Sequence, residues 1–110
     1  MAGLDPKALA KDMIAAAGTI LKKKSAEVKQ YAKEEFEKLA KAFKDIEVQV
    51  LAGSMTLEQA KLQRDMVVNA SKSVLLAVEG MGKLAAEQAI NAALDVAKAP
   101  VNKALGFPLL

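Results

Sequence analysis

The sequence predicts an all-α protein organised as a long antiparallel helical hairpin, and three observations support this. The chain is 53% hydrophobic but only 4% aromatic, and such an aliphatic composition, rich in Ala, Lys and Glu, is typical of helices. Its three prolines lie near the ends, at positions 6, 100 and 108. One strong turn signal, at 53–56, separates two long runs of helical periodicity. A chain of 110 residues is expected to form a single domain, 1–110.

The first predicted helix covers about residues 6–52. Asp5 suits the N-cap and Pro6 suits the first helical position, where a missing N–H costs nothing. No further proline follows until residue 100. In its second half the apolar residues alternate at steps of three and four, as in helices that pack at a shallow angle. These residues are Phe36, Leu39, Phe43, Ile46 and Val50.

The turn at 53–56 is the best-defined feature of the sequence. Gly53 follows the last apolar residues of the first helix, and glycine favours the left-handed conformation that ends helices. Thr56 and Gln59 have the spacing of a capping box, which begins the next helix. Because the connection is so short, the second helix is expected to fold back beside the first.

The second predicted helix covers about residues 57–99. Pro100 is expected to end it, because proline removes a helical hydrogen bond and clashes with the preceding turn. Segment 100–110 then holds only a short helical turn. Gly80 and Gly82 weaken the second helix, and a break between them would give three helices instead of two; the sequence leaves this open.

A hairpin alone is predicted to be incomplete. The apolar band of the second helix is too wide for one partner helix to cover, and monomers rarely expose patches of that size. Self-association into a helical bundle is the simplest cover. The apolar tail either folds onto its own hairpin or docks on a neighbour. The predicted interface residues are Val68, Leu75, Leu76, Ile90, Leu94, Leu105, Phe107, Leu109 and Leu110.

Two groups of charges are candidates for specific roles. Lys24 stands on the apolar stripe of the first helix. Folding back about residue 54 brings it near Glu79, so the two are predicted to form a buried pair that fixes the register of the two helices. The alternative is that Lys24 extends its ammonium group to water. The basic cluster around it would contact anionic surfaces if it has a role beyond solvation. Its members are Lys22, Lys23, Lys29 and Lys33.

The composition argues against an enzyme. The chain has no His and no Cys, which removes the most common general base, the most common metal ligand and the thiol nucleophile. The serines have no base to activate them. We therefore expect no catalytic residue, no metal ligand, no cofactor and no small-molecule substrate.

The resulting functional hypothesis is a non-enzymatic structural or scaffolding subunit that self-associates or packs into a larger assembly. The alternative is an amphipathic coat or membrane-active protein with lysines at the lipid headgroups. A third reading, a small basic nucleic-acid-associated protein, is less favoured, because a single arginine and few aromatics provide neither bidentate readout nor base stacking. With no signal peptide or transmembrane helix apparent, the expected location is the cytoplasm or a protein assembly.

Overall fold

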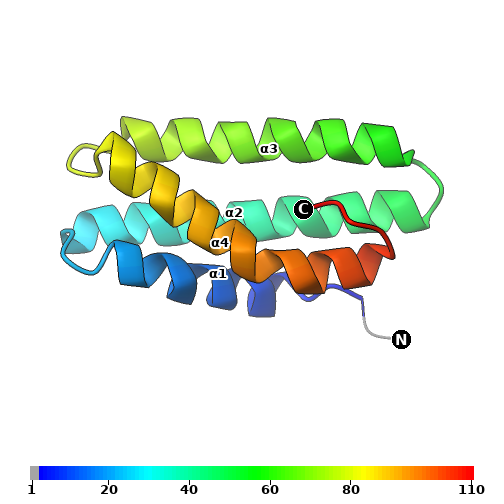
Figure 1. Ribbon diagram of the computed structural model, residues 1–110, viewed down its shortest axis with the longest axis horizontal. Coiled ribbons are helices and arrows are strands. Elements are labelled where there is room, and N and C mark those ends of the chain that lie inside the picture. Colours follow the sequence, from blue (N-terminus) through cyan, green and yellow to red (C-terminus); the bar gives the residue numbers. More distant parts are fainter. Residues whose placement is uncertain (1–2) are drawn as a thin grey trace.

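The computed structural model describes residues 3–110, and within them the protein is helical with no strand. Successive helices run in opposite directions, and α4 crosses over the others (Figure 1). The all-α prediction is therefore confirmed, whereas Met1 and Ala2 of the predicted domain lie outside the described residues. The helices are α1 (Pro6–Ile20), α2 (Ala26–Leu51), α3 (Leu57–Ala77) and α4 (Lys83–Leu105).

The prediction of two long helices is wrong, because each expected helix is divided. The first breaks at 21–25 into α1 and α2. Ser25 begins α2 as its N-cap, with its hydroxyl accepting a hydrogen bond from the Val28 N–H at 3.2 Å. The second breaks at 78–82, the break that the sequence left open. Gly80 and Gly82 have φ of +90° and +82° there, which suits glycine alone among common residues. The breaks let α1 fold back on α2, and α4 on α1, so the chain covers much of its own apolar surface.

The predicted turn is confirmed in its details. The α2 helix ends at Leu51, and Gly53 has φ +77°. Thr56 and Gln59 form the full capping box: the Gln59 N–H donates to the Thr56 hydroxyl at 3.1 Å, and the Thr56 N–H donates to the Gln59 side chain at 2.9 Å. Asp5 likewise caps α1, followed by Pro6 at its start.

Pro100 does not end the last helix, contrary to the sequence prediction. It lies inside α4, which continues to Leu105 and bends in its second half (Figure 1). The hydrogen bond that proline cannot donate would have gone to the carbonyl of Val96. Val96 is 39% exposed, so this turn of α4 lies at the protein surface.

The C-terminal tail docks on its own chain. Leu109 is fully buried, and its carbonyl accepts a hydrogen bond from the Arg64 guanidinium of α3. The Asn102 amide accepts from the Leu110 N–H at 2.9 Å and donates to the Leu110 carbonyl at 3.3 Å. Side chains of two helices therefore hold the tail in cis, the first of the two arrangements that the sequence left open.

The core combines a bulky centre with a closely packed alanine interface. Phe36 and Phe43 of α2 are fully buried, as the three-and-four spacing predicted. The helices α1 and α4 make the most extensive contact of any pair. Buried alanines, among them Ala17 and Ala93, line these two helices, and small side chains permit a close approach of helix backbones.

Two glycine substitutions are expected to change stability in opposite directions. Gly82→Ala should lower the free energy of unfolding by about 1–3 kcal/mol, because its φ of +82° and ψ of 146° lie in a region that is strained for any residue with a Cβ. Gly18→Ala should raise it by about 0.5–1 kcal/mol, because Gly18 lies within α1 and a Cβ there would meet nothing within 4 Å. Urea denaturation of both variants measures this. Equal effects would contradict the assigned break between α3 and α4.

Candidate functional site

The predicted interface residues do not form one surface in the folded chain. Leu75, Ile90, Leu105 and Leu109 are buried in the protein's own core, because the extra breaks bring α4 and the tail over them. Only Leu76, at 42% exposure, is largely open to solvent. The remaining four are half-buried: Val68, Leu94, Phe107 and Leu110.

The structure instead exposes a continuous uncharged row along α3, which we call the outer seam. Its members follow one another at steps of four, three, four and three, so they share one face of the helix. That face points away from the buried residues of α3, Ala60, Ser71 and Leu75. All five members are exposed, with Leu62 at 62% and Met66 at 58%. The outer seam consists of Leu62, Met66, Asn69, Ser73 and Leu76.

The two flanks of the outer seam differ in charge. One flank carries Asp65 and Lys72, seven residues apart and therefore on the same side of the helix. Both already make partly exposed ion pairs within the chain: Asp65 with Arg64 at 2.9 Å, and Lys72 with Glu87 at 3.7 Å. The opposite flank is uncharged, with Gln63, Ala70 and Ala77. Charge on a helix flank governs which partner helix can lie beside the seam.

The outer seam was visible in the sequence but was not identified there. Its spacing is as regular as that of the buried row on α2. Runs such as Met66-Val67-Val68 and Val74-Leu75-Leu76 place apolar residues on most sides of α3, so periodicity alone could not separate the buried side from the exposed one. The signal that could have identified the outer seam is the absence of charge at every third or fourth position from 62 to 76.

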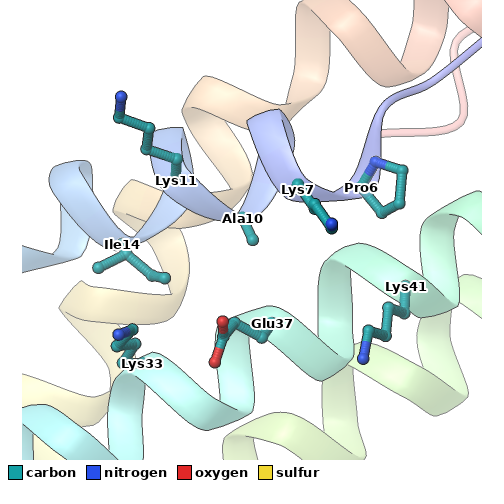
Figure 2. A pocket seen from close by; sticks show the side chains of 8 residues that line it. All are labelled: Pro6, Lys7, Ala10, Lys11, Ile14, Lys33, Glu37 and Lys41. Atoms are coloured by element: carbon teal, nitrogen blue, oxygen red, sulfur yellow. The ribbon is translucent and has the colours of Figure 1, made fainter.

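A second surface feature is a groove between α1 and α2, which we call the lysine groove. It has a volume of about 520 Å³. Pro6, Ala10 and Ile14 of α1 point toward α2 and form its apolar side (Figure 2). Around them lie four lysines and one glutamate, from both helices: Lys7, Lys11, Lys33, Glu37 and Lys41.

The predicted pair of Lys24 and Glu79 is not formed in the described part of the chain, where neither residue belongs to an ion pair. Glu79 is exposed at the end of α3, and the Lys24 ammonium instead lies near Gly82, 4.0 Å from where a Cβ would stand. The helix breaks on both sides explain this, because the two residues now sit in connections. Lys22, Lys23 and Lys29 are exposed away from the groove, whereas Lys33 lines it.

Within residues 3–110, no three acidic side chains gather as a metal site would require, and no helix there is both long and apolar enough to cross a membrane. Comparisons of the chain with models of protein families, with curated proteins and with solved structures found no match. The outer seam and the lysine groove are the candidate functional surfaces of residues 3–110.

Proposed function

We propose that this protein is a non-enzymatic structural or scaffolding subunit that self-associates through the outer seam of α3. The observation that carries the proposal is the uncharged row itself, which has coiled-coil spacing yet faces solvent in the single chain. Exposed Leu62 and Met66 would lose much of their contact with water against a second seam, and burial of apolar surface is the main favourable term in such association.

The flanking charges favour an antiparallel pair of identical helices. A two-fold axis perpendicular to both helices keeps each flank facing the same flank of the second copy. With the axis between Met66 and Asn69, Asp65 of each copy then lies near Lys72 of the other. In a parallel pair the charged flank would meet the uncharged one, and the attraction between Asp65 and Lys72 of the two copies would be lost.

The sizes of the seam residues suit the same arrangement. Leu62 lies beside Ser73 of the second copy, and Met66 lies beside Asn69 of the second copy, so large side chains alternate with small or polar ones. A polar Asn within an apolar seam favours one register over others at a cost in stability. In this register the two seams overlap from 62 to 73, about 17 Å at 1.5 Å per residue. This length places the interface at the low end of specific interfaces, so the dimer is expected to dissociate on dilution.

Met66→Lys is expected to raise the dissociation constant of the dimer at least about tenfold, because it places an unpaired ammonium group in the seam. Sedimentation equilibrium over a range of concentrations measures the constant. The matched control is Leu84→Lys, since Leu84 is 68% exposed on α4 and lies off the seam; this variant should dimerise as the original does.

The orientation has its own test. Asp65→Lys and Lys72→Asp should each weaken the dimer, and the double variant should recover in part. The pairing between copies is restored with its signs exchanged, whereas the pairs with Arg64 and Glu87 within each chain are lost. A chain that stays monomeric up to about 1 mM, equivalent to only about 4 kcal/mol of association, would contradict the proposal. So would strong, seam-dependent binding to liposomes by a chain that does not dimerise, which would favour a lipid surface as the partner.

A further inference from the structure

We infer that the lysine groove is a binding site for a small anionic amphiphile, a molecule with one apolar chain and a negatively charged head. The groove lies on α1 and α2, apart from the outer seam on α3, and its function does not depend on dimerisation. It also departs from the sequence-based expectation, which foresaw contacts with an anionic surface but no small molecule.

The charge around the groove favours the binding of an anion. Four lysines line it against a single Glu37, and within residues 3–110 none of the four lysines belongs to an ion pair. The ammonium groups come from two helices that are separated in sequence by the connection at 21–25. Several like charges around one concave space raise the local concentration of a molecule of opposite charge.

The apolar side of the groove favours a ligand that has an apolar chain in addition to its negative charge. Ala10 is 6% exposed, and Pro6 and Ile14 are half-buried, so the groove lies over an apolar surface. The aliphatic stems of Lys7, Lys33 and Lys41 extend that surface, whereas the Lys11 ammonium points away from α2 (Figure 2). Inorganic phosphate would use only the rim, whereas an apolar chain with an anionic head would use both parts.

The dimensions favour a small molecule over a protein segment. The volume of about 520 Å³ lies in the range of small-molecule sites. The lining residues span Pro6–Ile14 on α1 and Lys33–Lys41 on α2, which is about 12 Å along each helix. A docked amphipathic helix lays anchors at i, i+3, i+4 and i+7 along a hydrophobic groove, whereas the apolar part of this groove consists of only three residues, Pro6, Ala10 and Ile14.

The test uses the whole chain and three probes at concentrations below micelle formation: decanoate, decyltrimethylammonium with the same chain length, and inorganic phosphate. Decanoate should bind, and its amide chemical-shift changes in ¹H–¹⁵N spectra should map to α1 and α2. The other two probes should bind at least about tenfold more weakly, because each lacks either the charge or the chain. Added salt should weaken decanoate binding, since exposed charges are screened.

Variants then assign the site. The double variant K33Q/K41Q should weaken decanoate binding about five- to tenfold, the effect of two exposed charge contacts. The matched control K22Q/K98Q removes two exposed lysines outside the groove and should leave binding unchanged. Met66→Lys should also leave it unchanged, which separates this inference from the proposed dimer. Thermal unfolding of each variant confirms that it is folded.

Three outcomes would overturn the inference. The first is the absence of decanoate binding, and the second is equal binding of the cationic probe. The third is a set of shifts that map to α3 instead of the groove. Tight binding of an acidic amphipathic helical peptide at the groove, without decanoate binding, would likewise replace the small molecule with a protein partner.

Discussion

Phe43→Ala is expected to lower the free energy of unfolding by about 3–5 kcal/mol, the usual cost of removing a phenyl ring from a close-packed core. Phe43 has no exposed surface and lies on the inner face of α2. Because α2 contacts all three other helices, no single helix can shift to fill the cavity. Domains of this size are stable by only about 5–15 kcal/mol, so the variant should lose a large fraction of its free energy of unfolding.

Urea denaturation followed by circular dichroism measures this loss. Tyr31→Ala is the matched control, since Tyr31 is an aromatic residue of the same helix but is 49% exposed; its cost should stay below about 1 kcal/mol. Equal losses for Phe43 and Tyr31 would contradict the assigned inner face of α2.

Glu47→Ala is expected to cost about 2–3 kcal/mol, because Glu47 is a buried carboxylate that anchors the start of the described chain. It is 1% exposed. One oxygen accepts the Leu4 N–H at 2.8 Å, and the other contacts the Lys44 ammonium at 2.7 Å. Removing the carboxylate leaves the Leu4 N–H without this acceptor, and hydrogen bonds to charged groups are among the stronger ones.

The readouts are urea denaturation and amide hydrogen exchange at Leu4. Exchange at Leu4 should accelerate in Glu47→Ala, while amides in the middle of α2 change only with global stability. The exchange rate at Leu4 in Glu47→Gln should fall between those of Glu47→Ala and the unmodified chain, because an amide has only one oxygen acceptor to offer. Glu34→Ala is the control, an exposed carboxylate on the same helix. Unchanged exchange at Leu4 would show that the contact does not hold this segment.

The candidate surfaces were only partly predictable. Lys33 was named in the sequence as a contact for anionic surfaces, and it does line the groove. Its partners Lys7 and Lys11 were not, because the sequence placed residues 6–52 on one straight helix, where these residues and Lys33 could never meet. Only the fold-back at 21–25 brings them to one groove. The outer seam was missed for a different reason, since apolar residues on most sides of α3 hid its spacing.

By itself, the sequence determined the local features of this protein. The capped start at Asp5-Pro6, the buried row on α2 and the turn from Gly53 to Gln59 are set by neighbouring residues, because caps and periodicity act over one or two turns of helix. The tertiary structure alone decided the number of helices, the path through Pro100 and the docking of the tail. These depend on which apolar surfaces can cover one another, and burial gained between distant segments outweighs local preferences of about 1–3 kcal/mol.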